Sequence, residues 1–227
     1  MQVDLDRQGS VFVLRMNGGE NRINQQFLAA MGKALNEVER STGPSALVTV
    51  GGEPKFYSNG FDLEWLASAG SEALAAFIAD VQRFLARLLA FPVALVAAIN
   101  GHAFAAGALL ALAHDYRVMR ADRGFFCLPE IDLNLVFTPG LLALIQAKLG
   151  PLVARDLILT GKRVGGREAE AMRIIDAAAE ADQVLPLALA RAEELASKDR
   201  RTLGGLKRGM YAAAIRLLEE GALPHIS

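Results

Sequence analysis

Hydrophobic residues in the first 140 positions follow two spacings, which predict strands alternating with helices. Short, nearly continuous apolar runs predict strands at residues 11–16, 46–50 and 94–99. Between them, apolar residues recur every three to four positions at residues 27–38 and 77–88, which predicts two amphipathic helices. The connections are too long for hairpins. We therefore expect an α/β fold with largely parallel strands.

Helical spacing dominates the chain after Gly140. The predicted helices cover residues 141–149, 154–159, 167–172, 185–196 and 203–218. Only the pair Ile174-Ile175 indicates a further short strand. The C-terminal third therefore reads as a helical extension whose apolar faces need a surface to pack against.

Composition narrows the class of protein. About half of the 227 residues are hydrophobic (52%), which is typical of a packed globular chain, and the formal charge of −1 gives no electrostatic case for nucleic acid. The most apolar run, residues 91–113, contains Pro92 and Gly101 and favours buried strand, turn and helix over a membrane span. The single cysteine, Cys127, excludes an internal disulfide and is expected to be a small buried residue.

Targeting signals are not evident in the sequence. The chain begins without a basic-then-apolar stretch, and residues 225–227 read His-Ile-Ser rather than a peroxisomal Ser-Lys-Leu. We therefore expect a cytoplasmic protein. Histidine and carboxylate spacings typical of zinc sites are also missing, so we expect no metal site.

The most informative segment lies between residues 99 and 140. It contains a turn of small residues, Ala105-Ala106-Gly107, followed by Glu130 among apolar neighbours such as Leu128 and Ile131. Backbone N–H groups at such a turn can hold a developing oxyanion. An apolar setting raises a carboxyl pKa, so Glu130 can act as a base near neutral pH. The segment predicts proton transfer beside an activated carbonyl group.

Five stretches together resemble the crotonase superfamily of acyl-CoA enzymes, in order and at the expected spacing. They are residues 46–63, 99–107, 114–117, 128–133 and 159–163. The resemblance implies a crotonase-like spiral of ββα units over residues 1–165 and a helical C-terminal region over residues 166–227. It also implies an acyl-CoA thioester as the ligand, no cofactor apart from the coenzyme A of the substrate, and a homotrimer or dimer of trimers.

The reaction depends on position 109. Hydratases of this family carry one glutamate shortly after the small-residue turn and a second in the Pro-Glu motif. Here the first position is Leu109 and only Glu130 remains, which is similar to the Δ3,Δ2-enoyl-CoA isomerases. Two alternatives stay open: another crotonase reaction, such as hydration, thioester hydrolysis or decarboxylation, and a non-catalytic acyl-CoA-binding trimer.

The resemblance assigns the remaining roles. The oxyanion would be held by the backbone N–H groups of Phe61 and Ala106, although alanine at 106 suits this role only with a negative φ. Coenzyme A would contact Arg22, Ile23 and Asn59. The residues expected to line the acyl pocket are Trp65, Leu109, Phe137 and Leu141.

Four further polar residues invite catalytic roles but are expected to be structural. Asp62 and Asp115 stand where the family uses aspartate to tie down a loop or begin a strand. His102 and His114 are expected to be packed, hydrogen-bonded side chains, because no metal-ligand spacing accompanies them.

Overall fold

The computed structural model describes residues 3–223 of the chain. The tripeptide at 225–227 and the first two residues, on which the expectations about targeting depend, lie outside the described part.

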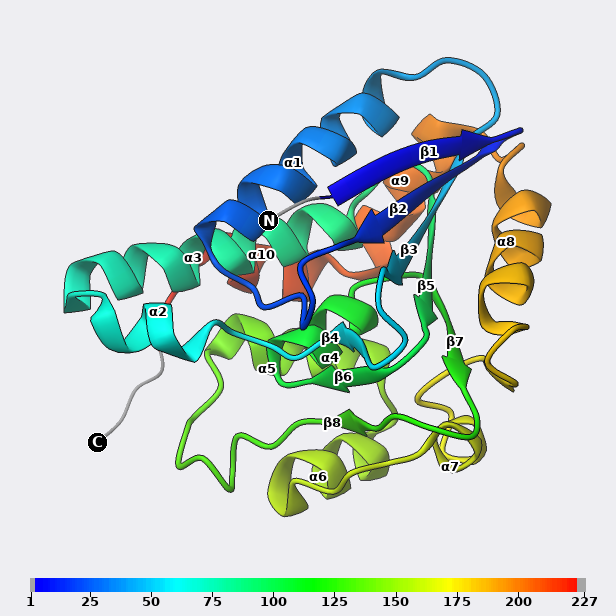
Figure 1. Cartoon of the computed structure of the whole chain (residues 1–227). Coiled ribbons are helices and arrows are strands. Elements are labelled where there is room, and N and C mark those ends of the chain that lie inside the picture. Colours follow the sequence, from blue (N-terminus) through cyan, green and yellow to red (C-terminus); the bar gives the residue numbers. More distant parts are fainter. Residues whose placement is uncertain (1–2, 224–227) are drawn as a thin grey trace.

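A six-stranded sheet forms the centre of the molecule (Figure 1). Its strands, in spatial order, are β1 (Val3–Gln8), β2 (Val11–Met16), β3 (Ala46–Gly51), β5 (Ala94–Ile99), β7 (Tyr116–Arg120) and β9 (Ala177–Ala179). Only the β1–β2 pair is antiparallel; every other neighbouring pair is parallel. The expected α/β class with largely parallel strands is confirmed.

A second, three-stranded parallel sheet lies beside the first and consists of β4 (Phe56–Ser58), β6 (His102–Phe104) and β8 (Phe126–Cys127). Each of its strands follows a strand of the large sheet and precedes a helix. The helices are α2 (Leu63–Ser68) and α3 (Ser71–Leu89) after β4, α4 (Ala106–Leu112) after β6, and α5 (Pro139–Lys148) after β8. This repeated strand–strand–helix order is the predicted spiral of ββα units.

Both faces of the central strands β2, β3 and β5 are buried, which explains why these strands read as continuous apolar runs. Valines such as Val13, Val48 and Val96 pack under helix α8 (Val184–Leu195) on one face. The other face contributes larger side chains to the main core with helices α1 (Gln25–Arg40), α3 and α4. Thr49 is a fully buried polar residue of β3, between Val48 and Val50.

The C-terminal region completes the same molecule. After α6 (Pro151–Thr160), it contains α7 (Gly166–Ala171), α8, α9 (Arg200–Met210) and α10 (Ala212–Glu220). Helix α10 packs against α3 and α5 of its own chain, burying Ala214 and Leu218. No helix within residues 3–223 is both long and apolar enough to cross a bilayer.

Two details differ from the sequence prediction. The single helix expected over residues 203–218 is divided at Tyr211, where the backbone leaves the helical region and the hydroxyl accepts from Lys148 Nζ of α5 at 3.1 Å. The expected strand at Ile174-Ile175 is a buried turn, because the Ile174 carbonyl accepts from the Arg117 side chain at 2.7 Å. The sheet pairing with β7 begins three residues later, at Ala177.

Candidate active site

Glu130 lies in the loop after β8 and is largely buried, with 9% of its surface exposed. Its Oε2 atom is buried and has no hydrogen-bond partner among the described residues. Burial disfavours the charged form and raises the pKa of the carboxyl group to about 7. A carboxyl group in this state can both accept and donate a proton near neutral pH.

The loop that carries Glu130 folds back on itself. Leu133 N and Leu135 N both donate to the Glu130 carbonyl oxygen, at 3.1 and 2.9 Å. Asp132 packs against Gly161, which ends α6 in a left-handed conformation (φ 59°). A methyl group on Gly161 would lie 2.5 Å from Asp132 Oδ2, and the positive φ of Gly161 favours glycine at this position.

The Phe61 N–H group is left unused by the pairing around it. Ile23 and Phe61 form an isolated parallel bridge, in which Ile23 N donates to Gly60 O at 2.8 Å and Asp62 N donates to Ile23 O at 3.1 Å. In a parallel bridge the flanking peptide groups make these bonds, and the N–H of the central residue faces the opposite side. Phe61 N–H has no acceptor within residues 3–223.

Ala106 is the first residue of α4, so its N–H has no partner inside the helix. It has no acceptor elsewhere in the described chain either. The positive φ at this turn belongs to Ala105 (φ 49°, ψ −122°), whose N–H donates to Cys127 O at 3.0 Å. Ala106 itself avoids positive φ, which meets the condition that alanine at this position had to satisfy.

Two glycines bring the segments of Phe61 and Ala106 into backbone contact. A methyl group on Gly60 would lie 2.9 Å from Phe104 O and 3.5 Å from Ala106 N. A methyl group on Gly107 would lie 2.3 Å from Ser58 O. The loop after β4 and the first turn of α4 are therefore neighbours, although more than forty positions separate them in the sequence.

The residues expected at the acyl pocket share one apolar cluster. Phe61 and Trp65 both contact the Phe77 ring, with ring centroids 5.7 and 4.6 Å apart. Leu109, Phe137 and Leu141 are buried in the same cluster. Their role as the lining of a cavity that faces Glu130 remains a prediction.

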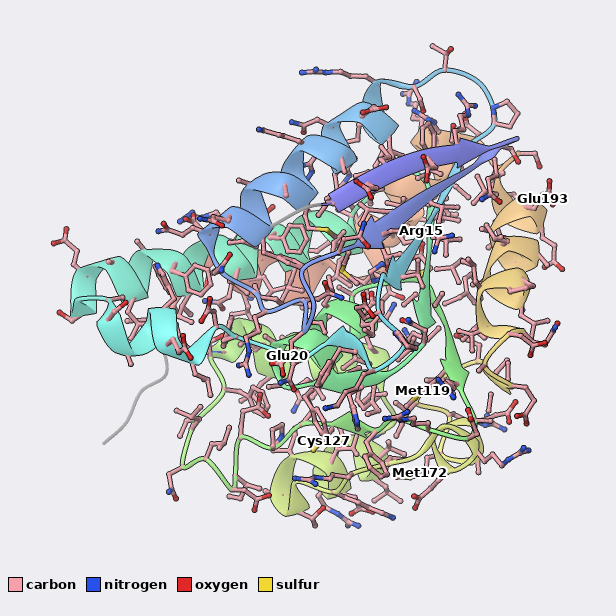
Figure 2. The ribbon with its side chains drawn as sticks, viewed as in Figure 1. Arg15, Glu20, Met119, Cys127, Met172 and Glu193 are labelled. Atoms are coloured by element: carbon pink, nitrogen blue, oxygen red, sulfur yellow. The ribbon has the colours of Figure 1, made fainter. Side chains whose placement is uncertain are left out.

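The residues expected to bind coenzyme A gather around a side chain that the sequence did not single out. Glu20, labelled in Figure 2, accepts from Arg22 at 2.6 Å and from Asn59 Nδ2 at 3.0 Å. Arg22 also donates to Phe61 O at 3.3 Å, whereas the Ile23 side chain is buried. A phosphate that binds Arg22 would therefore compete with the Glu20 carboxylate.

Other polar residues make the kind of contacts expected of structural side chains. Asp62 caps α2 by accepting from Trp65 N, and Asp115 accepts from Leu95 N at the start of β5. His102 stacks on Phe104, and the Cys127 side chain is fully buried. Across residues 3–223, no group of three potential metal-ligating side chains comes together.

The ββα spiral defines a fold of the crotonase type, and comparison with known proteins identifies the family. The sequence matches the enoyl-CoA hydratase/isomerase family over residues 6–222, so the chain belongs to that family. The resemblance inferred from the motifs is confirmed.

Relatives cover nearly the whole chain. Enoyl-CoA delta isomerase 3 of Arabidopsis thaliana is 37% identical over 95% of this chain and 94% of its own length. The peroxisomal enoyl-CoA delta isomerase 2 of the same plant is 39% identical over 86% and 85%. Human mitochondrial delta3-delta2-enoyl-CoA isomerase superposes with a TM-score of 0.88 at 25% identity, over 95% of this chain and 85% of that one. Because peroxisomal forms occur among the relatives, the cytoplasmic location stays a prediction.

Proposed function

We propose that this chain moves the double bond of a 3-enoyl-CoA to the 2 position. Glu130 removes a proton from C2, and the electrons of the C–H bond delocalise over the thioester carbonyl and the C3–C4 double bond. The N–H groups of Phe61 and Ala106 stabilise the charge on the carbonyl oxygen. The same carboxyl group then delivers the proton to C4, so no atom is gained or lost.

The buried Glu130 carboxyl group carries this proposal. Its pKa of about 7 suits a residue that must accept a proton and return it within one turnover. Hydration would require further activation of water, and position 109 supplies leucine where the hydratases have a second glutamate. The relatives named as enoyl-CoA delta isomerases support the same choice of reaction.

The substrate follows from the surroundings of the site. The acyl chain would lie against Trp65, Phe137 and Leu141, whereas Arg22 and Asn59 would contact the coenzyme A portion. On the Glu130 loop, apolar side chains such as Ile131 and Leu135 are about half exposed, which suits a path for an apolar chain. Coenzyme A belongs to the substrate, and no other cofactor enters the reaction.

The test is isomerisation of 3-hexenoyl-CoA by the parent and by Glu130→Gln. The amide keeps the shape of the side chain but cannot take the proton, so we expect kcat to fall by at least about 100-fold with KM little changed. Asp132→Asn, which removes a carboxylate two residues away, is the matched control and should keep parental activity. A Glu130→Gln variant within about threefold of the parent would overturn the assignment.

A further inference from the structure

A fully buried series of hydrogen bonds links strand β4, strand β3 and the end of helix α4. Tyr57 Oη lies 2.8 Å from Thr49 Oγ1, and Thr49 Oγ1 lies 2.8 Å from His114 Nε2. His114 Nδ1 lies 2.8 Å from the Leu110 carbonyl oxygen. The three side chains have no exposed surface, and none of them takes part in the proposed reaction.

Each proton in this series of hydrogen bonds has only one possible position. The Leu110 carbonyl can only accept, so His114 Nδ1 carries a proton and donates it. Burial lowers the pKa of His114 to about 3, so the ring is neutral and its Nε2 accepts from the Thr49 hydroxyl. Thr49 Oγ1 then accepts a hydrogen bond from the Tyr57 hydroxyl group. Burial raises the pKa of Tyr57, so this hydroxyl group keeps its proton.

This series of hydrogen bonds joins the two elements that present Phe61 and Ala106. Tyr57 belongs to β4, four residues before Phe61. His114 follows α4 and bonds the carbonyl of Leu110, a residue of the helix that begins at Ala106. The backbone N–H of His114 donates to Ala111 O at 3.2 Å and not to Leu110 O. The imidazole therefore supplies the hydrogen bond that the Leu110 carbonyl accepts at the helix C-terminus.

These bonds complement the glycine contacts described above. At its first turn, α4 touches strand β4 through Gly107 against Ser58. At its last turn, it is bound through His114 to Thr49 on the large sheet. All seven residues of α4 are buried and helical, so we expect the helix to move as a unit and to pass a shift at its C-terminus on to Ala106.

We propose that Thr49 is a positioning residue for the reaction: through Tyr57 and His114, it sets the separation at which the N–H groups of Phe61 and Ala106 share one oxygen. This inference rests on the proposed function, because it assigns a purpose to the geometry of those two donors. Thr49 touches no substrate and acts only through the elements that it joins.

The test compares Thr49→Val with Thr49→Ser. Valine keeps the branched shape but breaks both hydrogen bonds, whereas serine retains the hydroxyl group. For 3-hexenoyl-CoA we expect Thr49→Val to lower kcat by about tenfold to a hundredfold with KM within about twofold, because a misplaced oxyanion site weakens transition-state binding most. Thr49→Ser should recover most of the parental kcat.

Infrared spectroscopy of bound 2-hexenoyl-CoA, isotopically labelled at the thioester carbonyl, separates positioning from general stability. The C=O stretch should move toward its value in free solution in Thr49→Val and stay at the parental value in Thr49→Ser. Parental kcat and C=O stretch in a folded Thr49→Val would overturn the inference. Lower thermal stability with parental values of both would likewise assign Thr49 a structural role only.

Tyr57→Phe provides a second variant in case Thr49→Val fails to fold. It removes only the first donor of the series of hydrogen bonds, so the bond from Thr49 to His114 remains, and we expect a smaller loss of kcat in the same direction. A folded Tyr57→Phe with parental kcat and C=O stretch would contradict the inference. Failure of the proposed function is distinguishable, because an active Glu130→Gln overturns that function whatever the Thr49 variants do.

Discussion

Burial should let Glu130 keep its proton at a pH where exposed glutamates have lost theirs, because the side chain is largely buried and its Oε2 atom has no hydrogen-bond partner among the described residues. Such a group is a stronger base than an exposed carboxylate once it ionises. The same burial makes ionisation costly for the folded chain. Activity and stability should therefore depend on pH in opposite directions at this residue.

The activity should follow the ionised form of Glu130. Only the carboxylate can take the C2 proton, so kcat/KM for 3-hexenoyl-CoA should rise about tenfold per pH unit at low pH. It should then level off above pH about 7. A pH–rate profile of the parent measures this midpoint, and a midpoint near the ordinary value of 4.5 would show that the carboxyl group is not desolvated in solution.

The stability should follow the opposite sign. Between pH 4.5 and about 7 the folded chain holds a proton on Glu130 that the unfolded chain has lost, so the free energy of unfolding falls as pH rises through this window. The Glu130→Gln variant has no carboxyl group to ionise at this position, so its free energy of unfolding should not fall for this reason. Calorimetry should give similar Tm values for parent and variant at pH 5. At pH 8 the variant should have the higher Tm, with a free energy of unfolding larger by up to about 3 kcal/mol. Asp132→Asn should show no such gain, and an equal Tm for Glu130→Gln and parent at pH 8 would contradict the argument.

Sequence motifs indicated Glu130, Phe61 and Ala106, because their local patterns are distinctive. Thr49 left no such signal. It lies inside an apolar strand, where a β-branched residue is ordinary, and its partner His114 is 65 positions away. Glu20 was missed for a similar reason, since its contact with Asn59 spans 39 positions.

At the scale of elements, the contact between α4 and β4 depends on the absence of a side chain at Gly107. We expect Gly107→Ala to push the first turn of α4 away from Ser58 O and to lower both kcat and Tm, because the added methyl group would lie 2.3 Å from that backbone atom. Steady-state kinetics and thermal unfolding measure the two effects.

Gly205→Ala on α9 is the matched control for this substitution. No atom lies within 4 Å of the methyl group it would add, so it should leave kcat unchanged and raise Tm slightly through helix propensity. Parental kcat and Tm in Gly107→Ala would show that α4 and β4 can separate without consequence for the site.

The long strands and helices were predictable from periodicity, whereas the short ones were not. Strands β4, β6 and β8 have two or three residues each, too few to show an alternating pattern. Strand β9 is three alanines, which have no preference for strands, and it forms because β7 offers an unpaired edge. Tertiary contacts, rather than local preference, decide these elements.

At the scale of the whole molecule, the C-terminal helices bury only part of their apolar surface within the chain. On α9, Leu206 and Met210 are 60% and 71% exposed. We predict that these residues lie in the interface of a homotrimer. Sedimentation should then give three times the 24.3 kDa mass of the chain. Substituting glutamate at both positions should yield monomers, because buried unpaired charges oppose association.

Leu187→Glu is the control for the trimer prediction. Leu187 is also partly exposed, at 43%, but it lies on α8 against the large sheet. This variant should remain trimeric. A monomeric parent, or a trimer that survives both glutamates on α9, would contradict the assignment of this face.

In the reaction that we propose, the positive-φ turn at Ala105 affects the cost of each catalytic cycle. An alanine at φ 49° is unfavourable by about 1–3 kcal/mol, and this strain is incurred once, when the chain folds. The N–H groups of Phe61 and Ala106 have no acceptor among residues 3–223. If they hold the carbonyl oxygen as proposed, their dipoles do not have to reorient as the enolate forms, and the reorganisation energy that water would demand at that moment is largely avoided. We then expect fast substrate binding, because both donors are in place beforehand.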